Sequence, residues 1–549
     1  MRHRSLYMRT MIFMVMIGLL FGCATGEESI VQENTELLSP SVEALVRPVM
    51  ASKAMASIAM DTGVNTQSFS PSDKNTEEYD RITDNPFRSV ADDPVSTFSI
   101  DSDTASYTNV RRFLTQSSEL PPKDAVRIEE FLQYFPYKYA QPSGEHPIGY
   151  QLDMEPAPWA PEHRILRIAL KAEEIMTEEL PASNLVFLID TSGSMHSDNK
   201  LPLLQKSMQI LVEQLRPQDS ISIVAYAGSA GVILERTSGE RQKTILAAFT
   251  DLQAGGSTAG GAGIELAYQI ARENYIPSGN NRVILCTDGD FNVGVSSTGE
   301  LERLIEEKRE QNIYLTILGL GMGNYKDSRM EALSNIGNGN YAYIDNLLEA
   351  KKVLGKEIWG NLFAVAKDVK IQIEFNPTIV GSYRLIGYEN RVLNREDFND
   401  DGKDAGEMGS GQTVTAFYEL VLTSSQEEES SSSDPLVFQE STVIPSDDLL
   451  SLKIRYKRPE EGKESSQLMS VLMNEESLFH EPGKTDEDFT FASAVVEFGM
   501  LLRDSPYQGD SSWQHVLTRA KESKGVDENG YRAQFIQLVE LAELLSKQK

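Results

Sequence analysis

Cysteine is scarce in this sequence, which has only Cys23 and Cys286 among its 549 residues. Two cysteines cannot build a disulfide framework, so the folded regions must depend on hydrophobic cores. Cys286 ends the apolar run at residues 283–286, a pattern typical of a buried strand. A single thiol in such a place usually fills space in a core, and we expect the same of Cys286.

Basic residues are also few relative to acidic ones. The sequence contains 51 Lys and Arg residues against 82 Asp and Glu residues, and its formal net charge is −31. Proteins that bind nucleic acid gather Lys and Arg on one surface to contact phosphates. This charge balance therefore argues against a nucleic-acid partner. It fits an extracytoplasmic surface that attracts divalent cations diffusely.

Motifs that carry catalysis are missing. The six histidines are scattered, and the sequence has neither H-E-x-x-H nor G-x-S-x-G. The glycines at residues 255–263 lack the G-K-[ST] of a phosphate-binding loop, and residues 319–323 lack the full G-x-G-x-x-G spacing of a dinucleotide-binding loop. We therefore expect a protein without enzymatic activity.

The first residues have the pattern of an export signal. An apolar run at residues 11–21 follows a basic start and ends at Gly22 and Cys23. It has the length of a signal peptide and is too short to cross a bilayer. Its end resembles a bacterial lipobox, which implies that residues 1–22 are removed and that Cys23 is lipidated. The alternative is an ordinary signal peptide with an incidental cysteine.

The same resemblance implies a location for the protein. Lipidated Cys23 would make it an extracytoplasmic lipoprotein that is anchored to a membrane. Ala24 follows the cysteine, where an aspartate would signal retention at the inner membrane. In a cell with two membranes we therefore expect the outer one.

Composition and periodicity divide the rest of the chain into four parts. Residues 23–84 are polar and acidic, as in a flexible tether. Residues 85–181 mix strand-like and helix-like patterns and are expected to form an α+β domain. Residues 182–358 alternate strands with helices, and residues 361–549 are rich in strands and end in helices. We therefore expect three folded domains after the tether.

The central segment, residues 182–358, has the pattern of an α/β fold. A continuous apolar run at residues 185–189 is typical of a strand that is buried on both faces. Strand patterns at residues 220–226, 282–286 and 313–318 alternate with helical spacing. This alternation predicts a doubly wound, mostly parallel sheet, in which ligands bind beyond the carboxyl ends of the strands.

Residues with oxygen-bearing side chains gather at the predicted carboxyl ends of these strands. Asp190, Ser192 and Ser194 form a D-x-S-x-S pattern directly after the first strand. Thr258 lies in a glycine-rich loop before a helix, and Asp288 follows another strand of the same sheet. Hydroxyl and carboxylate oxygens are the ligands that a hard cation such as Mg²⁺ prefers. The five residues therefore predict a metal site at one edge of the sheet.

This set resembles the metal-ion-dependent adhesion site of von Willebrand factor type A (VWA) domains, in which the same residue types occupy the positions of Asp190, Ser192, Ser194, Thr258 and Asp288. The resemblance implies a Rossmann-like VWA fold for residues 182–358. It implies that the hydroxyl groups bind the metal directly and that the aspartates bind it directly or through water. Mg²⁺ is the expected ion, with Mn²⁺ and Ca²⁺ as alternatives.

The flanking segments extend the resemblance to a group of bacterial VWA lipoproteins. Residues 98–107 and 109–114 are similar to the domain that precedes the VWA module in that group. Residues 394–401 and 404–407 are similar to its C-terminal domain. The chain after the tether is therefore identified as a member of this group.

The resemblance implies a binding module of the cell envelope. A protein or glycan partner would complete the metal's coordination with a carboxylate, while the lipid on Cys23 would hold the protein at the membrane. The alternative is a structural or regulatory scaffold of the envelope, in which the VWA domain mediates the assembly of complexes.

Two further acidic patterns have structural explanations. Residues 101–104 imitate a second metal site, but Asp or Thr between a strand and a helix usually caps the helix. Residues 397–401 match the start of a calcium-binding loop, although the closing acid, Glu407, comes one residue early. We expect a helix cap and a surface turn, respectively.

Overall fold

The computed structural model describes residues 76–257, 260–289, 291, 298–423, 443–459, 466–478 and 486–548. The chain divides into two compact units, and all of these residues belong to the second, Ser70–Lys549. Cys23 and most of the predicted tether lie outside the described residues, so the signal peptide and the lipid anchor remain predictions. Among the described residues, no helix combines the length and the apolar character needed to cross a membrane.

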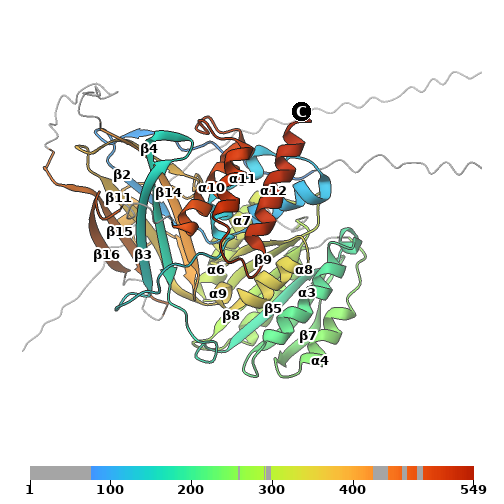
Figure 1. Ribbon diagram of the computed structural model, residues 1–549. Helices are drawn as coiled ribbons and strands as arrows, with labels where there is room; N and C mark the ends of the chain where they lie inside the picture. Colours follow the sequence, from blue (N-terminus) through green and yellow to red (C-terminus); the bar gives the residue numbers. More distant parts are fainter. Residues whose placement is uncertain are drawn as a thin grey trace, which may run out of the picture. The chain divides into compact units, whose positions relative to one another are not determined.

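The central segment forms the predicted α/β fold (Figure 1). Within the described residues its sheet has six strands, in the order β10-β9-β8-β5-β6-β7. Neighbouring strands are parallel except β6 and β7. The strands are β5 (Ser183–Asp190), β6 (Ser220–Tyr226), β7 (Ala230–Ser238), β8 (Asn280–Thr287), β9 (Tyr314–Leu320) and β10 (Tyr341–Ile344). Every residue of β5 is buried, which agrees with its continuous apolar run.

Helices cover both faces of this sheet, as expected for a doubly wound fold. One hydrophobic cluster places α3 and α4 against one face, and another places α5, α6 and α7 against the other. The helices are α3 (Leu201–Gln214), α4 (Gln242–Thr250), α5 (Gly260–Glu273), α6 (Thr298–Glu310), α7 (Asp327–Ile336), α8 (Leu347–Lys351) and α9 (Ile358–Leu362). A Cβ atom on Gly263 would lie only 2.9 Å from Cβ of Tyr226. The start of α5 therefore packs closely against the carboxyl end of β6.

The segments before and after the central fold share their sheets. Among the described residues, one sheet has the order β1-β12-β14-β4-β3, and another has the order β13-β11-β15-β16 with β2 also paired to β11. The strands are β1 (Arg88–Ser89), β2 (Val95–Ser99), β3 (Ile148–Ala157), β4 (Ala160–Ala172), β11 (Ala364–Phe375), β12 (Val380–Ile386), β13 (Gly406–Gly409), β14 (Thr413–Leu422), β15 (Asp448–Lys457) and β16 (Ser466–Asn474). One hydrophobic cluster contains residues of both sheets, as in a β-sandwich.

This sharing differs from the expected division into one domain at residues 85–181 and another at residues 361–549. Strands β4 and β14 pair in antiparallel orientation. Arg164 is opposite Leu420 at one end of the pairing, and Lys171 is opposite Thr413 at the other. Alternation of apolar and polar residues predicts that a strand has a buried face, but it does not identify the neighbouring strand. Only the structure therefore shows which strands of the distant segments pair with each other.

Helices from both flanking segments cover the sheet that contains β4 and β14. An aromatic-rich cluster joins their buried faces to that sheet. The helices are α1 (Ala105–Arg112), α2 (Ile128–Gln133), α10 (Glu487–Arg503), α11 (Trp513–Glu522) and α12 (Tyr531–Ser546). Figure 1 shows α10, α11 and α12 side by side in red. They confirm the helices that the sequence predicted at the end of residues 361–549.

Buried ion pairs join the flanking segments to the central fold. A guanidinium nitrogen of Arg111 on α1 lies 2.5 Å from a carboxylate oxygen of Asp345 and 2.7 Å from one of Glu349. A guanidinium nitrogen of Arg127 lies 2.5 Å from a carboxylate oxygen of Asp327 on α7. Because a buried charge is tolerated only beside an opposite charge, these pairs fix the position of α1 and α2 against the central fold.

Residues 76–84, which we expected to be the end of the tether, pack against this folded unit. The carboxylate of Glu77 accepts hydrogen bonds of 2.8 Å from both terminal nitrogens of Arg112. Glu77 lies in a polar stretch of the sequence, where nothing indicates that its side chain is buried. The folded region therefore includes residues that the sequence assigned to the tether.

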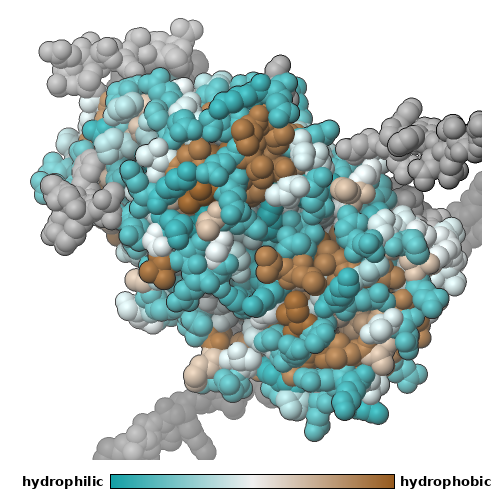
Figure 2. Space-filling view, turned by 45° about the vertical axis from the view of Figure 1, so that its right-hand side comes forward, coloured by the Kyte–Doolittle hydropathy of each residue, from teal (hydrophilic) through white to brown (hydrophobic). Residues whose placement is uncertain are grey.

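In the view of Figure 2, most of the surface is hydrophilic, and polar side chains divide the apolar areas. The most exposed apolar side chains of the described residues include Ile444, Val526 and Leu348. They come from different parts of the chain, and scattered exposure of this kind is normal for folded proteins.

Candidate metal centre

The D-x-S-x-S turn begins at the carboxyl end of β5. Asp190 is the last residue of this strand, and a short 3-10 helix, Gly193–His196, follows it. The backbone N–H of Ser192 donates a hydrogen bond of 2.8 Å to Oδ1 of Asp190. The hydroxyl oxygens of Ser192 and Ser194 lie 3.0 Å apart. The turn therefore brings one carboxylate and two hydroxyl groups together, as the sequence predicted.

The glycine-rich loop before α5 lies against this turn. The backbone N–H of Gly193 donates to the carbonyl oxygen of Gly256 at 3.1 Å, and the N–H of Gly255 donates to the carbonyl oxygen of Thr191 at 2.8 Å. Thr258 lies outside the described residues. Its neighbours on the N-terminal side nevertheless contact the D-x-S-x-S turn directly.

Asp288 lies at the same edge of the sheet. It follows Thr287, the last residue of β8, and β8 is the parallel neighbour of β5. The hydroxyl group of Thr287 donates to Oδ2 of Asp190 at 3.3 Å. Both Asp190 and Asp288 are fully buried. The structure therefore brings together the four predicted site residues that it describes.

The surroundings of Asp190 disfavour the ionised form of its carboxylate. Burial, helped by the nearby charge of Asp288, raises the pKa of Asp190 from 3.8 to about 6, although hydrogen bonds from Ser192 and Tyr226 oppose the shift. Tyr226 on β6 also donates its hydroxyl proton to Oδ2 of Asp190 at 3.2 Å. A positive charge at this position would favour the ionised form of Asp190.

A lysine that sequence reasoning missed supplies such a charge to Asp288. Nζ of Lys200, the residue before α3, lies 2.7 Å from Oδ2 of Asp288. Lys200 is only 7% exposed. A single lysine before a helix gives no sign in the sequence that it reaches a site between β5 and β8.

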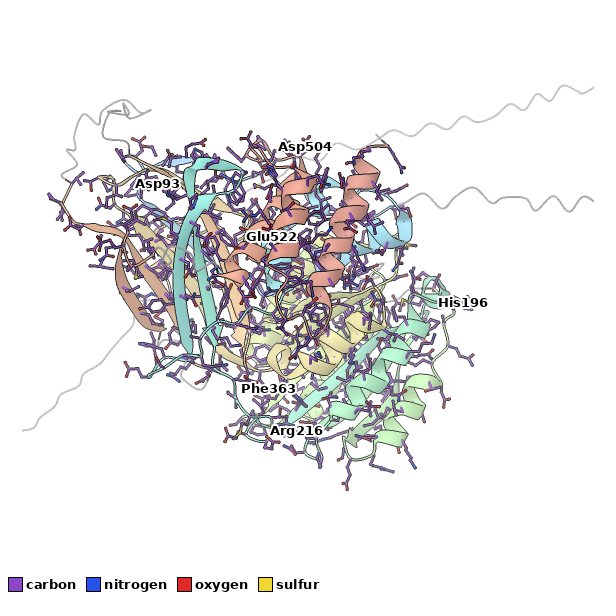
Figure 3. The ribbon with its side chains drawn as sticks, viewed as in Figure 1. Asp93, His196, Arg216, Phe363, Asp504 and Glu522 are labelled. Carbon is purple, nitrogen blue, oxygen red and sulfur yellow. The ribbon has the colours of Figure 1, made fainter. Side chains whose placement is uncertain are left out.

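The donor set fits a hard divalent cation. It consists of two carboxylates and two hydroxyl groups, and oxygen ligands with few carboxylates suit Mg²⁺, which keeps several waters. His196 follows Ser194 by two residues and is exposed, and Figure 3 shows it on the right-hand side of the view. Asp290, the other residue expected at the rim, lies outside the described residues.

The calcium-like pattern at residues 397–401 already binds ammonium groups. Nζ of Lys370 donates to the carbonyl oxygens of Asp397 at 3.1 Å and Asp400 at 2.5 Å. Nζ of Lys457 donates to the carbonyl oxygen of Asp401 at 2.6 Å. The side-chain oxygens that a calcium loop would use also have partners in the protein: Asp397 accepts from the backbone N–H of Asn394 at 3.0 Å, and Asn399 accepts from Arg455 at 2.9 Å. These contacts agree with the expected turn.

The pattern at residues 101–104 takes part in a buried ion-pair cluster. Thr104 precedes α1, but within the described structure its side chain makes no capping hydrogen bond. Asp101 instead pairs with Arg391 at 2.9 Å. Three buried carboxylates each place an oxygen within 4.8 Å of the others: Asp101, Glu130 and Glu331. Because arginines already neutralise this cluster, we interpret it as structural.

Comparisons with known proteins identify the family. Residues 184–355 match the model of the von Willebrand factor type A domain, residues 73–167 match a model described as von Willebrand factor, and residues 360–545 match the model "Uncharacterized protein YfbK, C-terminal". The chain is 46% identical over 479 residues to the uncharacterized protein YfbK of Escherichia coli, covering 85% of this chain and 81% of that protein. The chain belongs to the YfbK family.

Other similarities to this YfbK-family protein concern smaller regions or the fold. The uncharacterized protein sll0103 of Synechocystis is 28% identical over 192 residues, which cover 34% of this chain and 43% of that protein. Among solved structures, a von Willebrand factor type A protein from Catenulispora acidiphila is 14% identical, with a TM-score of 0.40, covering 71% of this chain and 89% of that chain. The match of residues 184–355 to the VWA domain model and the relative YfbK confirm the predicted bacterial VWA family, and the sheet of the central segment agrees with the predicted fold.

Proposed function

We propose that this YfbK-family protein binds a protein or glycan partner at the cell envelope through a divalent cation in its VWA domain. A VWA domain indicates a role in protein–protein interaction or as a scaffold. The observation that supports the more specific proposal is the convergence of Asp190, Ser192, Ser194 and Asp288 at one strand edge. Each of these side chains offers oxygen, the element that Mg²⁺ prefers as a ligand.

The residues of the site would have different roles in binding the cation. The hydroxyl groups of Ser192, Ser194 and Thr258 would hold the cation without adding negative charge, and the two aspartates would balance part of its charge. A bound Mg²⁺ supplies an electrophilic centre that attracts a carboxylate of the partner. Hydrogen bonds from Tyr226 and Thr287 orient the carboxylate of Asp190 within the site.

The envelope location is the second part of the proposal. It rests on the apolar run at residues 11–21 and on Cys23, whose lipidation would anchor the protein. The acidic composition, with a net charge of −31, is compatible with an extracytoplasmic surface.

One observation favours the alternative of a scaffold that works without metal. Lys200 already neutralises Asp288 at 2.7 Å, so part of the site is satisfied by the protein itself. In that case the VWA domain would assemble envelope complexes through its surface and would have no need of a cation.

Calorimetric titration of Mg²⁺ and Mn²⁺ separates the two functions. We expect the wild type to bind both ions and Asp190→Ala to lose binding while it keeps its fold. Asp198→Ala is a matched control, because Asp198 is exposed in the same loop between β5 and α3. Thr258→Ala should weaken metal binding mildly and partner binding clearly. Equal metal affinity in the wild type and Asp190→Ala would remove the adhesion-site proposal and leave the scaffold.

A further inference from the structure

The first described residues lie along the loop that joins β9 to α7. We call residues 76–80 the N-terminal segment and residues 321–326 the β9–α7 loop. The backbone N–H of Thr76 donates to the carbonyl oxygen of Gly323 at 2.8 Å, and the N–H of Glu78 donates to the carbonyl oxygen of Tyr325 at 3.0 Å. The N-terminal segment thus forms a short parallel pairing with this loop.

Glu77 fixes this pairing with a buried carboxylate. Its Oε1 accepts a hydrogen bond of 2.8 Å from the backbone N–H of Gly323. Both of its oxygens also accept from Arg112 on α1, and its side chain is only 3% exposed. Burial alone would raise the pKa of Glu77, but the hydrogen bonds and charge of Arg112 lower it below its ordinary value. Glu77 therefore links the N-terminal segment, the β9–α7 loop and α1 in its ionised form.

The opposite side of the same loop contacts the metal site. Nδ2 of Asn324 lies 3.5 Å from Oδ2 of Asp288, and Oδ1 of Asn324 lies 3.4 Å from Nζ of Lys200. A Cβ atom on Gly321 would overlap the alkyl stem of Lys200. A Cβ atom on Gly289, the residue after Asp288, would lie 2.7 Å from the backbone nitrogen of Lys326. The β9–α7 loop therefore packs between Glu77 and Asp288.

We propose that Glu77 is a positioning residue of the metal site and that the N-terminal segment sets the affinity of this site. Glu77 holds the β9–α7 loop, and Asn324 of this loop contacts Asp288, so the loop keeps the carboxylate of Asp288 in place for the cation. This role rests on the proposed function, because it assumes that the site binds metal.

The coupling must act in both directions. If the N-terminal segment favours metal binding, thermodynamic linkage requires that metal binding favour the docked segment by the same factor. Mg²⁺ should then slow amide hydrogen exchange at residues 76–80 and 321–326, since exchange reports the local opening of hydrogen bonds.

Titration of Mg²⁺ into three full-chain variants tests the proposal. Glu77→Ala removes the acceptor of the Gly323 N–H and the partner of Arg112, and we expect it to weaken Mg²⁺ binding about tenfold, as for other residues that support metal ligands indirectly. Glu77→Gln keeps an acceptor but loses the ion pair, so its loss should be smaller. Glu78→Ala is the control, because the Glu78 side chain is 73% exposed and pairs only with Lys326 among the described contacts. It should stay within about twofold of the wild type.

The outcomes separate this role from the proposed function. Absence of Mg²⁺ binding in the wild type would overturn both. Binding that is lost in Asp190→Ala but unchanged in both Glu77 variants would overturn only the positioning role, even if those variants are less stable. If Glu77→Ala does not fold, Glu77→Gln and hydrogen exchange of the wild type decide: equal exchange at residues 76–80 with and without Mg²⁺ would overturn the coupling.

Discussion

Nζ of Lys200 lies 2.7 Å from Oδ2 of Asp288, and both side chains are buried. A buried carboxylate without a partner is strongly unfavourable, because the interior cannot replace its hydration. Lys200 therefore stabilises Asp288 in the cation-free protein. The alkyl stem of Lys200 packs on Gly321, so its charge and its packing can be tested separately.

Lys200→Met should destabilise the cation-free protein and spare the cation-bound one. Methionine keeps an unbranched stem against Gly321 but removes the ammonium group beside the buried carboxylate of Asp288. We expect a loss of about 3–5 kcal/mol in the free energy of unfolding, measured by urea denaturation in EDTA. Saturating Mg²⁺ should recover much of this loss, because the cation would then neutralise Asp288.

Lys206→Met on the exposed side of α3 is the control for this experiment. It changes the same residue type in the same helix region but removes no buried ion pair, so its effect should be small in both conditions. An equal loss for Lys200→Met with and without Mg²⁺ would contradict a cation at Asp288.

Asp190→Asn should stabilise the cation-free protein at high pH and not at low pH. The pKa of Asp190 is raised by burial from 3.8 to about 6. As pH rises between these values, the unfolded chain loses its proton while the folded chain keeps it, so wild-type stability falls. Asparagine carries no such penalty and should gain up to about 3 kcal/mol at pH 8, and almost nothing near pH 3. Denaturation in EDTA across this range measures the difference, and a gain that is independent of pH would contradict the assignment.

Arg111→Ala should destabilise the protein far more than Arg88→Ala. Arg111 pairs with Asp345 and Glu349 through side chains that are at most 3% exposed, whereas the side chains of Arg88 and Asp93 are each 46% exposed. We expect a loss of about 3–5 kcal/mol for the buried arginine and at most about 1 kcal/mol for the exposed one. Thermal and chemical unfolding of both variants measure this, and similar losses would show that these ion pairs do not fix α1 to the central fold.

Cys23→Ser should release the protein from membranes. The acyl chains of a mature lipoprotein anchor a protein stably, and the substitution removes their site of attachment. Fractionation of cells after salt and urea washes measures the distribution. A Cys23→Ser protein that stays with the membrane fraction would contradict the lipid anchor.

The central fold could be predicted because its signals are local. The apolar run at residues 185–189 requires burial on both faces, and alternation with helical patterns makes a parallel sheet the simplest way to provide it. The D-x-S-x-S pattern could be assigned for the same reason. Its residues are adjacent in the chain, and Asp288 follows a strand whose carboxyl end meets the same edge.

The partners of these residues could not be predicted. Lys200 contacts Asp288, which is 88 positions away in the sequence, and Glu77 contacts Gly323, which is 246 positions away. Neither residue belongs to a periodic or spaced pattern. A lysine or glutamate is normally expected to be exposed, because its side chain is charged. Lys200 and Glu77 are buried because each pairs with a residue far along the chain.

The sequence by itself determined the VWA fold of residues 182–358, the candidate metal ligands and the helices at the C-terminal end. In each case the signal is hydrophobic periodicity or a short motif, and it lies within a few helical turns or a single strand. The tertiary structure alone decided that residues from both flanks build one sandwich, that Lys200 neutralises Asp288 and that residues 76–80 dock beside the site. These features depend on which surfaces meet when distant segments pack, and a strand or a charged side chain carries no local record of the partner it meets.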